Sequence, residues 1–238
     1  RVSIGRYGAA TQLSHYTNVW HRDAFPPTRV LFKSGYPQDA WSIPTYLYKA
    51  ATVEGGIGNA LSGDHRFEEP LPEVDWLAKV PFEEVRLLGE GPSFLPLMHL
   101  DAWRYTGDAA PLLERWDYLM HALRGQQVTE EGLMPFSGDE TFRPPYGYNI
   151  DRGLTYAFEL ETWSAYSGFL FVSACERLAD FIEAAGADKP EDLAWLRERA
   201  AFVRERTDAA YWLEDGAYYA SMIYRESREP EPRALVLP

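Results

Sequence analysis

The sequence is poor in cysteine and contains no long apolar run. Its one cysteine, Cys175, cannot form an internal disulfide, so the fold does not require an oxidising compartment and we expect a cytoplasmic location. No run of about 18 apolar residues is present, and no basic-then-apolar segment opens the chain, so we expect no membrane partner. The chain begins with Arg1 rather than Met, and we expect a fragment of a longer polypeptide.

Positive charge is also scarce. The chain has 23 Lys and Arg residues against 36 Asp and Glu residues, which gives a net charge of −13. This excess of acid repels phosphate backbones and anionic membrane surfaces, so we expect no nucleic-acid partner.

Signatures of metal and cofactor binding are missing as well. The five histidines show no His-x-x-x-His pairing, and the single cysteine excludes a Cys-x-x-Cys motif. Neither a Walker sequence nor a Gly-x-Gly-x-x-Gly motif after a strand is present. We therefore expect no metal site and no cofactor.

Aromatic residues, in contrast, are abundant. The sequence has 8 Trp, 15 Tyr and 12 Phe residues, 15% of the chain. Rings in this number either enlarge the core or line a cleft that stacks flat, weakly polar ligands such as sugars. Composition alone leaves both interpretations open.

Apolar residues recur with a helical period along most of the chain, which predicts an all-α fold. The clearest helix covers residues 167–185 and stops at Gly186, and a second helix begins at Pro190, so the two form a helical hairpin. Two earlier hairpins are predicted from residues 23–33 with 38–53 and from 94–105 with 109–124. The three hairpins recur at a spacing of roughly 70 residues.

The segments between the hairpins differ from the turns within them. Residues 54–91 and 125–161 are long and rich in Gly, Pro, aromatic and acidic residues, and long loops in compact domains are usually functional. We divide the chain into a leading segment over residues 1–22, a helical-hairpin domain over 23–226 and a tail over 227–238.

The first candidate site lies at the start of the first predicted helix. Here Trp20 offers a stacking face, while Arg22 and Asp23 offer a donor fork and an acceptor for the vicinal hydroxyls of a sugar. The alternative is structural: Trp20 is a core ring, Asp23 favours the helix N-terminus, and Arg22 is its charge partner.

The second candidate site is the acidic pair Asp139 and Glu140. Met134, Phe136 and Phe142 flank it with apolar surface, which would raise the pKa of a carboxyl by disfavouring its charged form. A carboxyl that stays neutral near pH 7 can serve as a general acid. The alternative is a turn with two solvated acids.

The third candidate site precedes two other predicted helices. Glu161 and Trp163 lead into the helix over residues 167–185, and Glu90 holds the comparable place before the helix over 94–105. If the hairpins form a ring, both acids lie on the same rim and can contact a ligand. Each acid can equally be a charge that favours a helix N-terminus.

Several short motifs occur in a distinctive order along the chain. They are WHRD at residues 20–23, GYPQDA at 35–40, YTGD at 105–108, GLMP at 132–135 and SGDE at 137–140. Their order resembles the six-hairpin glycosidases, and within them the glucoamylase, trehalase and glycogen-debranching group. The resemblance implies an (α/α)6 toroid of twelve helices, of which the six predicted helices are about half.

The resemblance also implies a function. It identifies the chain as part of an inverting glycoside hydrolase that cleaves α-linked, glucose-containing saccharides, with a saccharide as its partner. It gives Trp20, Arg22 and Asp23 the role of binding the non-reducing sugar and puts the general acid at Asp139 or Glu140, with Glu140 preferred. The general base would lie outside this chain. A toroid-fold phosphorylase or epimerase and a non-catalytic saccharide-binding module are the alternatives.

Overall fold

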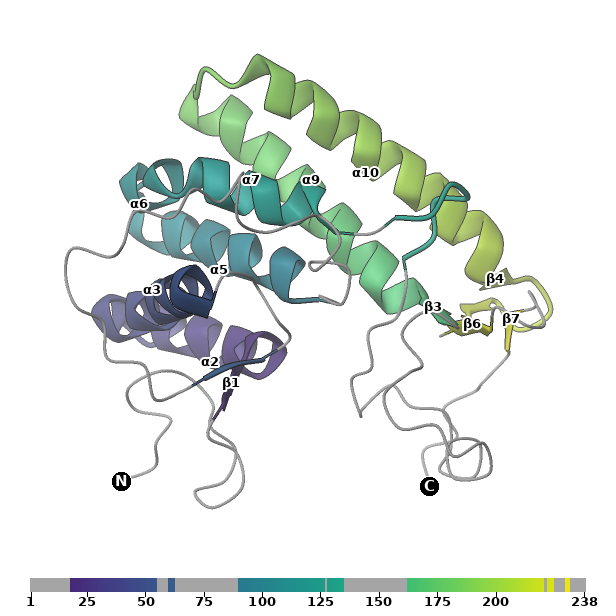
Figure 1. Cartoon of the computed structure of the whole chain (residues 1–238), viewed down its shortest axis with the longest axis horizontal. Coiled ribbons are helices and arrows are strands. Elements are labelled where there is room, and N and C mark those ends of the chain that lie inside the picture. The colour runs from purple at the N-terminus through teal and green to yellow at the C-terminus, as the bar shows by residue number, and fades with distance from the viewer. Residues whose placement is uncertain are drawn as a thin grey trace. The chain divides into compact units, whose positions relative to one another are not determined.

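A computed structural model describes residues 18–54, 60–62, 90–126, 128–134, 162–220, 222–224 and 230–231 (Figure 1). This part of the chain contains seven helices and only short strands, which confirms the all-α prediction. None of these helices combines the length and apolar character that crossing a membrane requires. Closure of the hairpins into a toroid and the boundaries at residues 22 and 226 stay predictions.

The chain divides into two compact units. Unit 1 comprises residues 1–126 and 177–193, and unit 2 comprises residues 127–176 and 194–238. The third predicted hairpin contributes to both units, because α9 (Ala165–Ala185) and α10 (Pro190–Tyr211) each contain residues of both.

The first hairpin of unit 1 pairs α2 (His21–Lys33) with α3 (Pro37–Glu54). The turn between them needs Gly35, whose φ of 81° lies in the left-handed region. Pro26 and Pro27 remove two backbone donors inside α2, yet the helix continues through them. Tertiary contacts offset the lost hydrogen bonds, because the buried residues of α2 recur at helical spacing along one face. These residues are His21, Ala24, Thr28 and Phe32.

The second hairpin of unit 1 contains α5 (Gly91–Thr106), which ends at Gly107 with a left-handed φ of 74°. The returning helix, predicted as one element over residues 109–124, is instead two helices, α6 (Ala110–Glu114) and α7 (Trp116–Arg124). The break falls at Arg115, where the backbone leaves the helical region.

Contacts of its side chain hold Arg115 at this break. The guanidinium donates to Thr45 Oγ1 at 3.2 Å and to His99 Nε2 at 3.0 Å, and it lies 4.9 Å from the centre of the Tyr48 ring. Since Arg115 can only donate, His99 Nε2 accepts, and His99 Nδ1 donates to the Leu95 carbonyl at 2.8 Å. Burial, together with the nearby Arg115 charge, lowers the pKa of His99 to about 3, so the ring is neutral.

Helices α2 and α5 run side by side in the same direction (Figure 1). The Phe25 and Phe94 rings lie 5.3 Å apart, and Thr28 Oγ1 lies 3.8 Å from Met98 Sδ, 70 residues further along the chain. Equivalent positions of the first two hairpins are therefore neighbours, which confirms the predicted repeat. Every residue from Gly91 to Ala102 is buried, so α5 is the central helix of unit 1.

A buried carboxylate joins α5 to helices on two sides. Asp101 Oδ2 lies 3.1 Å from Arg29 Nε of α2, and Asp101 Oδ1 accepts a 2.5 Å hydrogen bond from Arg177 Nη2 of α9. Asp192 of α10 plays a similar role for α7, because it accepts from the Trp116 indole at 2.6 Å and from Arg124 at 2.7 Å.

In unit 2 the first part of α9 packs against α10. A Cβ at Gly168 would lie 2.7 Å from Thr207 Oγ1, so the two helices approach too closely for a side chain there. Cys175 is fully buried, and burial raises the pKa of its thiol, so it packs as a small apolar residue.

Short antiparallel strands complete unit 2. The strands β3 (Thr162–Ser164), β6 (Met222–Tyr224) and β7 (Pro230–Glu231) form one sheet in the order β3-β6-β7. A separate hairpin pairs β4 (Trp212–Leu213) with β5 (Tyr218–Tyr219). A small core joins these strands to the two helices; its buried members are Leu133, Ala165, Tyr211, Ala220 and Ile223.

We expect Asp101→Ala to lower the free energy of unfolding by about 3 kcal/mol, because it leaves two arginines without their shared buried carboxylate. Urea unfolding at pH 7 measures the loss. The control is Asp117→Ala, which removes a carboxylate that is 96% exposed and 3.5 Å from Lys189. That variant should stay within about 0.5 kcal/mol of the wild type, and equal losses in the two variants would contradict the role of Asp101.

Candidate functional site

A short sheet fixes the start of α2. Strand β1 (Asn18–Trp20) pairs antiparallel with β2 (Ala60–Ser62), and α2 begins at the next residue, His21. Trp20 precedes the helix in an extended conformation, with φ −94° and ψ 129°. The helix begins two residues earlier than the predicted start at Asp23, so both Arg22 and Asp23 lie in its first turn, and both side chains are partly buried.

Glu90 holds the matching position before α5. Its carbonyl accepts from the backbone N–H groups of Ser93 and Phe94 at 3.0 and 2.9 Å, which makes it the N-terminal flanking residue of the helix. The Glu90 side chain is only 8% exposed, and its Oε2 lies 3.4 Å from Arg22 Nη1. The fold therefore brings together two predicted site residues that are 68 positions apart.

The environment of Glu90 changes its proton affinity. Burial raises the pKa of Glu90 from 4.5 to about 7, and the Arg22 charge opposes this rise. Burial prevails because the ion pair is long and Arg22 is itself 21% exposed, so solvent screens part of its charge. The Glu90 carboxyl can therefore take up or release a proton near neutral pH.

Trp20 adds a donor and a ring to this end of unit 1. Its indole Nε1 is buried and has no hydrogen-bond partner among the residues that the structure describes. Together, Trp20, Arg22 and Glu90 supply an aromatic face, a guanidinium and a carboxyl of near-neutral pKa. Asp23 lies in the same helical turn as Arg22. This set of groups can hydrogen bond a neutral polyhydroxylated ligand and exchange a proton with it.

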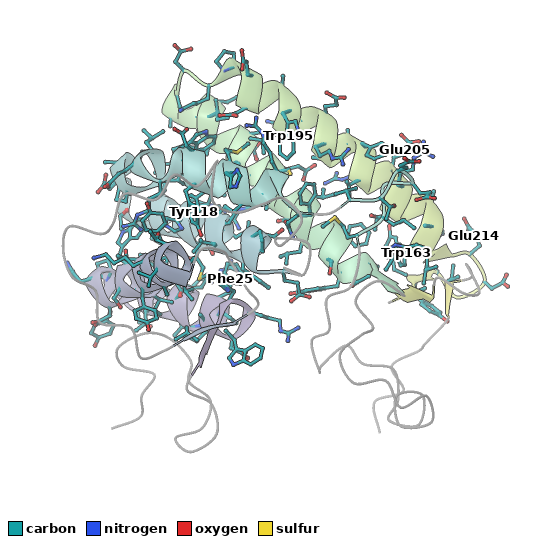
Figure 2. All side chains as sticks on the ribbon, in the orientation of Figure 1. Phe25, Tyr118, Trp163, Trp195, Glu205 and Glu214 are labelled. Atoms are coloured by element: carbon teal, nitrogen blue, oxygen red, sulfur yellow. The ribbon has the colours of Figure 1, made fainter. Side chains whose placement is uncertain are left out.

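The remaining predicted site residues are not in this group. Asp139, Glu140 and Glu161 lie outside the described residues. Trp163 belongs to unit 2, where it is partly buried in β3 opposite Ile223 and packs against the small core of that unit (Figure 2). Within the described residues, no group of three or more His, Cys, Asp or Glu side chains is placed to hold a metal ion.

Sequence reasoning missed Gln126, which follows α7 and is buried. Its Oε1 accepts a 2.5 Å hydrogen bond from Ser93 Oγ in the first turn of α5, three residues after Glu90. A polar residue just after an amphipathic helix is only a weak sequence signal for a functional role. The fold alone shows that the Gln126 side chain reaches the N-terminal end of α5.

A comparison with protein-family models finds no match, and neither does a comparison with curated protein sequences. Among solved structures, the chain is similar to the crystal structure of a sugar epimerase from a ruminal bacterium, with 11% sequence identity and a TM-score of 0.49. The match covers 86% of this chain and 47% of that one, so this chain spans about half the length of the solved structure. A similarity of this size does not assign a function.

The raised pKa of Glu90 predicts a pH-dependent stability. Well below pH 4.5 the carboxyl is protonated in both the folded and the unfolded state. As the pH rises from 4.5 to about 7, the unfolded state releases the proton while the folded state keeps it, so the free energy of unfolding falls over this range. Relative to Glu90→Gln, the wild type should lose about 3 kcal/mol of unfolding free energy between pH 4 and 8. Denaturant titrations of both proteins at these pH values measure the difference, and parallel pH profiles would contradict the prediction.

Proposed function

We propose that this chain is part of an inverting glycoside hydrolase of the six-hairpin type that acts on α-linked, glucose-containing saccharides. The observation that carries the proposal is the contact between Arg22 and Glu90, which joins the N-terminal ends of two adjacent parallel helices beside Trp20. The resemblance implies that loops between successive hairpins line the saccharide funnel, and both residues lie at such junctions. The sideways alignment of the hairpins also supports a toroid.

In this proposal the residues at the start of α2 hold the non-reducing sugar. The Trp20 ring stacks on the apolar face of a pyranose, and Arg22 and Asp23 hydrogen bond its hydroxyls. Glu90 contacts the same sugar, accepting a hydrogen bond when ionised and donating one when protonated. Arg22 orients the Glu90 carboxyl through their 3.4 Å contact.

The proposed reaction uses two carboxyl groups. Glu140, or Asp139 beside it, donates a proton to the glycosidic oxygen as the bond between that oxygen and the anomeric carbon breaks. A carboxylate on the opposite face of the sugar takes a proton from the water that attacks the anomeric carbon, so the configuration inverts. We assign this base to a part of the protein outside this chain.

We expect Glu140→Gln to lower kcat by about 10²–10⁴-fold, because the amide cannot donate a carboxylic proton. Hydrolysis of maltose, trehalose and longer α-glucosides by the protein that carries this chain measures the change. Asp139→Asn tests the neighbouring acid, and Glu130→Gln is the control because Glu130 is an exposed acid shortly before the pair.

Activity of Glu140→Gln near that of the wild type would overturn the assignment of the acid. Sugar release that requires phosphate would indicate a phosphorylase, and an epimerised product would indicate an epimerase. Saccharide binding without turnover in the wild type would indicate a binding module.

A further inference from the structure

The β4–β5 hairpin of unit 2 carries two large aromatic side chains that are partly open to solvent. Trp212 and Tyr219 are cross-strand partners, and their ring centres lie 5.0 Å apart at an interplanar angle of 65°. Trp212 is 38% exposed and Tyr219 is 42% exposed. Two rings that meet at this angle form an open corner rather than a flat patch.

Contacts behind the corner hold Tyr219 in place. The Phe169 ring of α9 meets the Tyr219 ring edge-on, with centres 5.0 Å apart. The Tyr219 hydroxyl donates a 2.8 Å hydrogen bond to Asp208 Oδ1 of α10. The open face of Tyr219 therefore needs no rearrangement to receive a ligand, which lowers the entropic cost of binding.

The turn that joins the two strands is strained. Ala217 has a φ of 51°, a left-handed conformation that a residue with a Cβ adopts at a cost, and it is the one such non-glycine residue in the described part of the chain. A Cβ at the neighbouring Gly216 would lie 2.0 Å from the Tyr218 ring, so the turn packs tightly on its own strand. The hairpin thus keeps its two exposed rings together despite a conformational cost.

We propose that Trp212, Tyr219 and Asp208 form a second saccharide-binding surface, on unit 2, that takes one pyranose ring of a glucose-containing oligosaccharide. This inference rests on the proposed function. The apolar C–H face of the sugar stacks on the corner of the two rings, and its hydroxyls contact the Asp208 carboxylate and the Tyr219 hydroxyl.

The surroundings favour a neutral sugar over other occupants. Glu214, labelled in Figure 2, and Asp215 are exposed in the turn that joins the two strands, so the hairpin carries negative charge that disfavours anionic ligands. Phe169, which contacts Tyr219, packs against the same small core as Trp163, the predicted saccharide contact.

Calorimetric titration of the full chain with maltose and with longer α-linked glucose oligomers tests the proposal. We expect Trp212→Ala and Tyr219→Ala each to weaken oligosaccharide binding about tenfold, the size of effect for one well-packed aromatic contact. The matched control is Tyr36→Ala in unit 1, which removes a tyrosine that is 57% exposed and should bind as the wild type does. Tyr219→Phe keeps the ring and should weaken binding by less than Tyr219→Ala.

Far-UV circular dichroism shows whether each variant folds. If Trp212→Ala does not fold, Trp212→Thr replaces it, because threonine retains the strand preference without the ring. Folded variants that bind oligosaccharide with wild-type affinity would overturn the proposal. Variants that change self-association, measured by sedimentation, but leave sugar binding unchanged would also overturn it.

Two outcomes separate this inference from the proposed function. If the protein that carries this chain hydrolyses α-glucosides and the Trp212 and Tyr219 variants bind oligosaccharide unchanged, the second surface is wrong and the proposed function stands. If these variants lose affinity while the protein that carries this chain shows no hydrolysis of α-glucosides, the surface stands and the hydrolase function is wrong. A wild type that binds no glucose oligomer overturns both.

Discussion

The buried carboxylate of Asp101 is the interaction on which the arrangement of unit 1 depends. It lies in α5, the most buried helix of the unit; its Oδ2 pairs with the Arg29 guanidinium of α2 at 3.1 Å, and its Oδ1 accepts from Arg177 of α9. A charge in this position is costly unless cations compensate it, so the two neighbouring helices must bring their arginines to the same level of α5. The lateral register of the hairpins follows from that requirement.

The same register brings Glu90 to Arg22. Once α2 and α5 run in parallel with equivalent positions side by side, their N-terminal ends meet, and the residues that open both helices become neighbours. Burial at this meeting point raises the pKa of the Glu90 carboxyl to about 7, although a guanidinium lies 3.4 Å away. The property that suits Glu90 for proton exchange thus comes from packing and not from its residue type.

Helical periodicity and turn residues were sufficient to predict most elements of the fold. Gly186 ends its helix where predicted, Gly35 and Gly107 lie between the predicted helices of the first two hairpins, and each of the three has the positive φ that such a position favours. The break at Arg115 was not predicted, because the local sequence reads as one amphipathic helix. It arises from contacts with Thr45, His99 and Tyr48: Thr45 and Tyr48 belong to the preceding hairpin, and His99 lies 16 positions away.

The sequence by itself determined the helices, the repeat of about seventy residues and the identity of Trp20, Arg22, Asp23 and Glu90 as candidates, because these depend on local spacing and residue chemistry. Only the tertiary structure decided that Arg22 meets Glu90, that Trp163 lies against a separate small core, and that Trp212 and Tyr219 form an exposed corner. Those outcomes depend on contacts between residues far apart in the chain, which no local pattern encodes.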